Sequence, residues 1–107
     1  KAEAILRGGT PTSAGTYGGT ALEIVNTIRT HPSRSASALT DLTLDVLLDE
    51  RGREMYNEEW RRQDLIRFGK FLAPRKDAPQ SDDKYFLYTI PQTQVDVNPN
   101  LKQNPGY

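Results

Sequence analysis

Apolar residues recur at helical spacing in the first third of the chain, separated by turn-forming residues. Residues 1–7 have the composition of a short helix, and the glycine-rich segment 8–19 predicts its end and a loop. Thr20 predicts the start of a second helix, because Glu23 lies three residues later and completes a capping box. This helix must end before Pro32, which cannot continue it. Its expected apolar edge consists of Leu22, Val25 and Ile28.

Two more helices are expected in the middle of the chain. Thr43 is a suitable N-cap for the first of them. One face of this helix is predicted to carry Leu44, Leu47, Leu48, Arg51 and Met55. Asn57 is the expected cap of the next helix, which has Glu58 and Glu59 in its first turn and ends or bends at Gly69. Its inner side is predicted to carry Leu65, Phe68 and Leu72. The pattern therefore predicts paired helices.

The helical pattern is lost from Pro74 onwards. Five of the seven prolines lie in residues 74–107, so this part of the chain is expected to be irregular. Residues 85–90, "YFLYTI", form a short apolar run that predicts an extended segment. We expect the tail to lack a hydrogen-bonded scaffold of its own and to be ordered only by lying on a larger body. The predicted fold is all-α, with helical residues 1–73 followed by a loop and a long Pro/Asn-rich irregular tail over 74–107.

Composition narrows the classes of function. At 107 residues the chain is at most one small domain, and its 14 basic and 14 acidic residues give no net field that would attract nucleic acid or an anionic membrane. Without cysteine it has no disulfide, thiol nucleophile or thiolate metal site. No apolar run approaches the ~20 residues that cross a bilayer. Because only 36% of residues are hydrophobic and the chain opens without an initiator Met, we expect a fragment that shares its apolar surface with other segments.

Acidic and basic residues alternate at helical spacing in the middle of the chain. Residues three or four apart are neighbours on a helix, which predicts a structural ion-pair network. Its expected members are Glu50, Arg51, Glu54, Glu58, Arg61, Asp64 and Arg67. Glu50 should pair with Arg53, whereas Glu54 and Glu58 would repel unless the helix breaks near Asn57 or an Arg from elsewhere pairs with each carboxylate.

Three functional interpretations compete with this structural one. Paired carboxylates could cleave a glycosidic bond at a separation of about 5–5.5 Å, but inert helical neighbours meet that distance too. A nucleic-acid surface would need unneutralised Arg, and a calcium or magnesium site at Asp82 and Asp83 would need more ligands. No Ser has a credible base partner, and His31 is explained by its position at a helix end. We therefore expect no catalytic residue, metal or cofactor, and a network that braces packed helices.

Several aromatic residues could stack on sugar rings or be buried. Tyr56 and Trp60 are expected to be packed between helices, since large aromatic residues usually contribute to burial. For Tyr85 and Tyr88 both interpretations stay open.

Two segments, "LLDERGREMYNEEWRRQDLIRFGKF" and "YTIPQTQVDVNPNLKQNPGY", carry a resemblance to a known family. Together they resemble the C-terminal portion of the SusD/RagB family of outer-membrane nutrient-binding lipoproteins. The matching residues are Glu50-Arg51, Glu54, Glu58, Arg61, Asp64, Arg67, Gly69, Ile90-Pro91-Gln92, Asn98-Pro99-Asn100 and Gln103 to Tyr107. Residues 2–4 and 21–30 look like earlier helices of the family. The chain departs from the pattern at Glu59, where the family usually has Gly, and at Trp60, where His is common.

The resemblance implies tetratricopeptide-like helix pairs in an α-α superhelix, of which residues 1–107 would be the C-terminal part. It also implies a protein held by a lipid anchor outside this fragment, on the extracellular face of the outer membrane. Such a protein would bind oligosaccharides without cleaving them and pass them to a SusC-like TonB-dependent porin. The family's glycan platform lies largely in segments absent here, so no glycan-binding residue is assigned, and "NPGY" is expected to be the natural C-terminus. The alternative function is a helical-repeat scaffold that recruits a protein partner.

Overall fold

The computed structural model of the chain describes residues 1–13, 15 and 17–107. The predicted glycine-rich loop over residues 8–19 includes Ala14 and Thr16, which lie outside the described residues. The described chain is mostly helical, and its β-structure is limited to two isolated bridges, Thr12–Gly19 and Arg75–Ala78. It divides into two compact units, Lys1–Asn57 and Glu58–Tyr107.

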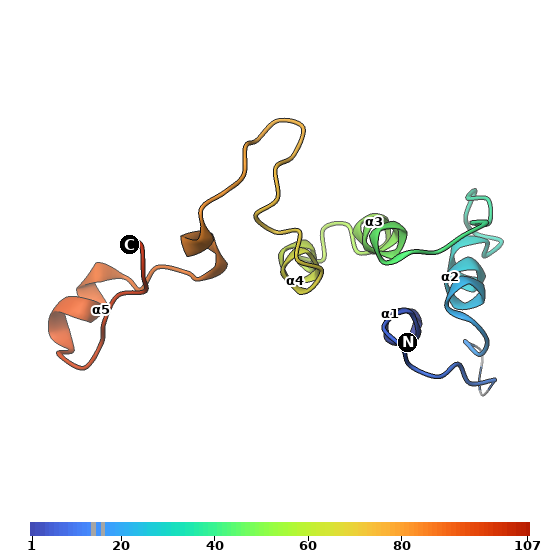
Figure 1. Cartoon of the computed structure of the whole chain (residues 1–107), viewed down its shortest axis with the longest axis horizontal. Helices are drawn as coiled ribbons and strands as arrows, with labels where there is room; N and C mark the ends of the chain where they lie inside the picture. Colours follow the sequence, from blue (N-terminus) through green and yellow to red (C-terminus); the bar gives the residue numbers. More distant parts are fainter. Residues whose placement is uncertain (14, 16) are drawn as a thin grey trace. The chain divides into compact units, whose positions relative to one another are not determined.

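The first unit contains α1 (Ala2–Leu6), α2 (Ala21–Arg29) and α3 (Leu44–Glu54). The short helix α1 contacts both α2 and α3, and all three can be followed in the blue to green part of Figure 1. Its Schellman motif confirms the predicted helix end, because the Gly9 N–H donates to the Ala4 carbonyl at 2.8 Å and the Gly8 N–H to the Ile5 carbonyl at 3.0 Å. The buried apolar residues of this unit are Ala2, Ala21, Ile24, Val25, Leu42, Leu47 and Leu48.

Helix α2 begins with the predicted capping box. The Glu23 N–H donates to the Thr20 hydroxyl at 3.2 Å, and the Thr20 N–H donates to the Glu23 carboxylate at 2.7 Å. The predicted apolar edge is partly wrong, because the helix buries Ile24 with Val25, whereas Ile28 is exposed. The buried side is therefore rotated by one position from the edge predicted by i, i+3 spacing.

Helix α3 has the predicted Thr43 cap, which accepts a hydrogen bond from the Val46 N–H at 3.2 Å. Leu47 and Leu48 are buried as expected. The segment between α2 and α3 is fixed by Asn26, whose side-chain amide donates to the Leu39 carbonyl at 3.0 Å and accepts from the Leu39 N–H at 2.8 Å. This paired amide replaces the backbone partners that a loop residue otherwise lacks.

The second unit contains α4 (Arg61–Arg67), the 3₁₀ helix η1 (Asp83–Phe86) and α5 (Gln92–Val97). The prediction that a helix begins at Asn57 is wrong. Asn57 and Glu59 have φ of 63° and 61°, which lie in the left-handed region and cannot continue a right-handed helix, so α4 begins only at Arg61. The predicted end is confirmed: Gly69 has φ of 69°, and the Lys70 N–H donates to the Leu65 carbonyl at 2.8 Å.

The tail differs from its prediction in three ways. Residues 83–86 form η1, so the expected extended run starts only at Leu87, and α5 lies where coil was expected. The tail also has a hydrogen-bonded scaffold of its own, contrary to expectation. Gln103 binds both backbone groups of Ile90 at 2.9 and 2.8 Å, and Asn104 donates to the Tyr88 carbonyl at 2.7 Å. The Tyr107 hydroxyl donates to the Leu87 carbonyl at 3.0 Å.

The C-terminal motif, residues 103–107, is therefore structural. The side chains of Gln103, Asn104 and Tyr107 supply the hydrogen bonds that residues 87–90 would otherwise receive from a partner strand in a sheet. Within the part of the chain that the structure describes, no helix combines the length and apolar character required to cross a bilayer.

Candidate functional site

The predicted ion-pair residues fall into two groups. Glu50, Arg51 and Glu54 lie in the first unit, and Glu58, Arg61, Asp64 and Arg67 lie in the second. A network that joins the two groups stays a prediction, and each group is described in its own unit.

Glu50 of α3 is engaged by two arginines. Its Oε2 lies 2.6 Å from Nη1 of Arg29 and 2.7 Å from Nη2 of Arg53, and only 15% of its side chain is exposed. Burial alone would raise the pKa of Glu50, but the hydrogen bonds from Arg53 and Arg29 outweigh it and hold this pKa below its ordinary value of 4.5. Arg29 also donates to the Ser37 carbonyl at 2.6 Å, so it ties the preceding loop to α3.

Glu54, one turn further along α3, is held by Arg34. The guanidinium donates two hydrogen bonds to the carboxylate, one of them over 2.7 Å between Nη2 and Oε1. The hydrogen bond to Glu54 raises the pKa of Arg34. Helix α3 ends at Glu54, so the helix breaks before Asn57, which is the first of the two ways in which repulsion between Glu54 and Glu58 was expected to be avoided. The second way is met for Glu54, through Arg34.

Asp64 of α4 is the most deeply buried polar side chain of the described residues, with 1% exposed. Its Oδ1 lies 2.7 Å from Nη2 of Arg67, one turn later on the same helix. A buried carboxylate in such a pair helps to hold α4 in place, and it is not accessible to a reactant.

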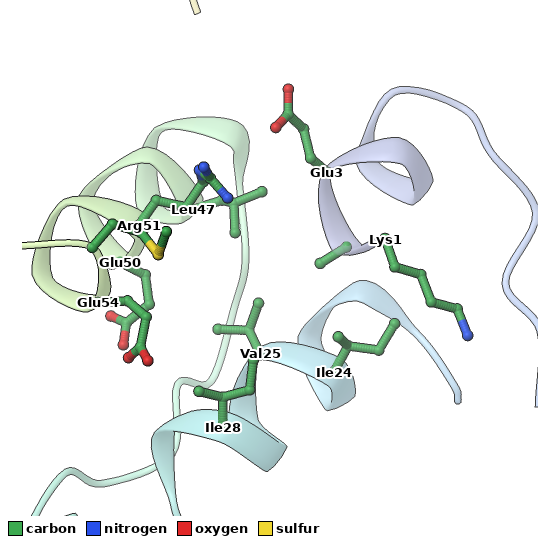
Figure 2. A pocket seen from close by; sticks show the side chains of 11 residues that line it. Lys1, Glu3, Ile24, Val25, Ile28, Leu47, Glu50, Arg51 and Glu54 are labelled. Carbon is green, nitrogen blue, oxygen red and sulfur yellow. The ribbon is translucent and has the colours of Figure 1, made fainter. Parts of the chain in front are cut away.

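An apolar cavity of about 290 Å³ lies among the three helices of the first unit. Figure 2 shows Val25 and Ile28 reaching from α2 towards a space that Leu47 of α3 also faces. Lys1, Glu3 and Arg51 stand on its border together with Glu50 and Glu54. Since arginines already bind the carboxylates of Glu50 and Glu54, the cavity suits an apolar side chain better than a reaction that needs a free base.

A second, open hollow of about 520 Å³ lies in the second unit. We call it the Trp60 hollow; it is lined by Glu58, Glu59, Trp60, Arg62, Gln63 and Tyr88. The expectation that Trp60 and Tyr56 are packed between helices is wrong in this chain, because they are 44% and 78% exposed. Tyr88, left open by the sequence, is 72% exposed.

Arg62 and Gln63 line this hollow, and no pattern in the sequence singled them out. The guanidinium carbon of Arg62 lies 4.4 Å from the centroid of the Tyr88 ring and 4.7 Å from that of Phe71. Its Nη2 donates to the carbonyls of Tyr85 and Phe86 at 2.8 and 3.0 Å. No spacing rule points to these partners, because most of them lie more than 20 residues away and two are backbone carbonyls.

The described residues contain no group of three His, Asp or Glu side chains placed to hold a metal ion. Asp82, weighed above as a calcium ligand, instead accepts a hydrogen bond from the Lys84 N–H at 2.9 Å and caps η1. His31 lies 2.8 Å from the Ser33 hydroxyl in the loop after α2.

Comparison with known proteins gives two matches. A sequence model of the SusD family matches residues 1–85. The starch-binding protein SusD of Bacteroides thetaiotaomicron is 32% identical over an alignment of 116 residues, which covers 100% of this chain and 19% of the relative. The chain thus spans about a fifth of the length of the curated relative that it matches.

Proposed function

Because the chain belongs to the SusD family, we propose that the complete protein binds oligosaccharides at the cell surface and delivers them to a SusC-like TonB-dependent porin. The family consists of non-enzymatic binding proteins. The observation that carries the proposal is the 32% identity with a protein named for starch binding, which extends over the whole of this chain.

The arrangement of the carboxylates supports binding without cleavage. Glu50 and Glu54 are each bound by arginines, and Asp64 is buried against Arg67. A glycosidase needs one carboxylic acid to donate a proton and a second carboxylate free to attack or to activate water. Side chains held in ion pairs suit neither role, so these residues brace the helices.

In this proposal the first unit serves as a rigid support. Its helices would belong to a tetratricopeptide-like superhelix, and residues 1–107 to the C-terminal part of a SusD-like domain. The protein would be anchored by lipid on the extracellular face of the outer membrane, so that bound saccharide is handed to the porin beneath it. Within each unit, the predicted ion-pair residues would brace the helices that carry them.

The test is a binding assay on the complete protein. An array of plant, microbial and host oligosaccharides identifies the ligands, and isothermal titration calorimetry gives their dissociation constants. We expect saturable binding of at least one saccharide class with no release of reducing ends over long incubation. Absence of binding to every saccharide, together with tight binding of a partner protein, would instead support the helical-repeat scaffold. Turnover abolished by Glu54→Gln in a folded protein would support an enzyme.

A further inference from the structure

Two aromatic rings and three polar side chains meet in the Trp60 hollow. Trp60 and Tyr88 are both exposed, although burial of large aromatic side chains is strongly favourable. The carboxylates of Glu58 and Glu59 and the amide of Gln63 line the same hollow. Its volume of about 520 Å³ falls within the range of roughly 300–1,000 Å³ that is typical of small-molecule sites.

The Tyr88 side of the hollow is held in place before any ligand arrives. Arg62 lies against the Tyr88 ring and is itself fixed by the carbonyls of Tyr85 and Phe86. The Tyr88 carbonyl accepts a hydrogen bond from Asn104 at 2.7 Å. A ring fixed on both its backbone and its face loses little freedom when a ligand stacks on it, which favours binding.

The Trp60 side is presented by a strained backbone. Glu59 adopts a left-handed conformation that is unfavourable for a residue with a long side chain, and Asn57, a residue type that adopts this conformation more readily, is left-handed as well. Such conformations are found disproportionately where a binding or catalytic site needs them. Here the left-handed Glu59 directly precedes Trp60, which is the N-cap of α4. Glu58, Glu59 and Trp60 therefore lie together at the hollow.

We propose that the Trp60 hollow is a saccharide-binding site of this chain, with the saccharide contacting both Trp60 and Tyr88 and a pyranose ring stacked on one of them. The apolar face of the ring contacts the indole or phenol, and sugar hydroxyls donate to the carboxylates of Glu58 and Glu59 and bind the Gln63 amide. Arg62 positions Tyr88: its guanidinium stacks on the Tyr88 ring, and its Nη2 is held by the carbonyls of Tyr85 and Phe86. The site rests on the proposed function for its ligand class and adds a location for it.

The ring exposure and the polar composition together favour a saccharide over a purely apolar partner. An apolar partner surface would bury Glu58 and Glu59 without supplying donors to them, which is costly for a carboxylate. A sugar presents hydroxyl donors at its edge and C–H groups on its face, and therefore satisfies both parts of the hollow.

The experiment uses the complete protein with 5-fluorotryptophan incorporated. The ¹⁹F resonance that disappears in Trp60→Phe belongs to Trp60, and each saccharide bound on the array is titrated against it. We expect the Trp60 resonance to shift and saturate with at least one of them. Trp60→Ala and Tyr88→Ala should each raise the dissociation constant of that saccharide about tenfold, as measured by calorimetry. Tyr56→Ala, which removes a similarly exposed tyrosine outside the hollow, is the matched control and should leave the affinity unchanged.

The outcomes separate the two proposals. Saccharide binding with an unmoved Trp60 resonance and unaltered affinity in both alanine variants would overturn the site and leave the proposed function standing. No binding of any saccharide on the array would overturn both. Because the rings are exposed, their removal should not unfold the protein, and circular dichroism of each variant checks this.

Discussion

Asp64→Ala removes the carboxylate that pairs with Arg67 inside the second unit, and its cost can be worked out from the geometry. The 2.7 Å contact is a charge-assisted hydrogen bond, which is worth about 1.5–3 kcal/mol. Removing one partner of a fully buried pair costs about 3–5 kcal/mol, but Arg67 is 42% exposed and can be solvated after the loss. Alanine also favours the helix by a few tenths of a kcal/mol. We therefore expect the local opening of α4 to become easier by about 2 kcal/mol.

The assay is hydrogen–deuterium exchange of the complete protein, read on peptides that cover residues 61–67. A decrease of about 2 kcal/mol in the opening free energy accelerates exchange roughly 30-fold, since 1.4 kcal/mol corresponds to a factor of ten. Asp83→Ala is the matched control: it removes an exposed aspartate from the first turn of η1 and should change stability by less than about 0.5 kcal/mol. If exchange in α4 stays within threefold of the wild-type rate after Asp64→Ala, the buried pair does not stabilise this helix and the reasoning fails.

Three further perturbations test other parts of the structure. Thr20→Ala removes the hydroxyl of the capping box and should destabilise α2 by about 1 kcal/mol, measured by exchange of its first turn. Glu59→Gly removes the backbone strain of a left-handed glutamate and should stabilise this segment by about 1 kcal/mol, which slows hydrogen exchange of the peptide that contains residue 59. Glu58→Gly, at a residue without positive φ, should speed this exchange. Acid should weaken α3: the folded-state pKa of Glu50 is lowered, so the unfolded chain binds its proton more tightly. The stability from Glu50 is then complete above pH 4.5 and lost as pH falls through the lowered value. A urea midpoint followed from pH 6 to pH 3 checks this, and Glu50→Gln should flatten the profile.

Local signals in the sequence predicted four of the helix ends. Thr20, Thr43, Gly8 and Gly69 act within one turn of the chain, through hydrogen bonds whose partners are fixed by helix geometry. The same is true of the pair formed by Glu50 and Arg53, which are three residues apart. Where the partner lies inside one helix, spacing is enough to identify it.

Non-local contacts and backbone strain were not predictable in the same way. The pairing of Glu54 with Arg34 joins residues 20 apart, and nothing in the spacing selects Arg34 over another arginine. Glu59 has a high helix propensity, but its backbone is left-handed in the structure, so α4 begins at Arg61 and not at Glu58. The exposure of Trp60 follows from that shift, because a residue placed inside a helix in the prediction lies at the helix start in the structure.

The C-terminal motif and the Trp60 hollow are parts of one arrangement. Tyr88 is brought to the hollow from the tail, and its backbone is held there by Asn104 and its ring by Arg62 of α4. The Tyr107 hydroxyl fixes the adjacent carbonyl of Leu87. Since isolated extended segments are not stable in water, these side-chain bonds are what keep Tyr88 beside Trp60. The polar residues of the C-terminal segment, which in the sequence indicated only an irregular tail, therefore decide whether Tyr88 joins Trp60 in the proposed saccharide site.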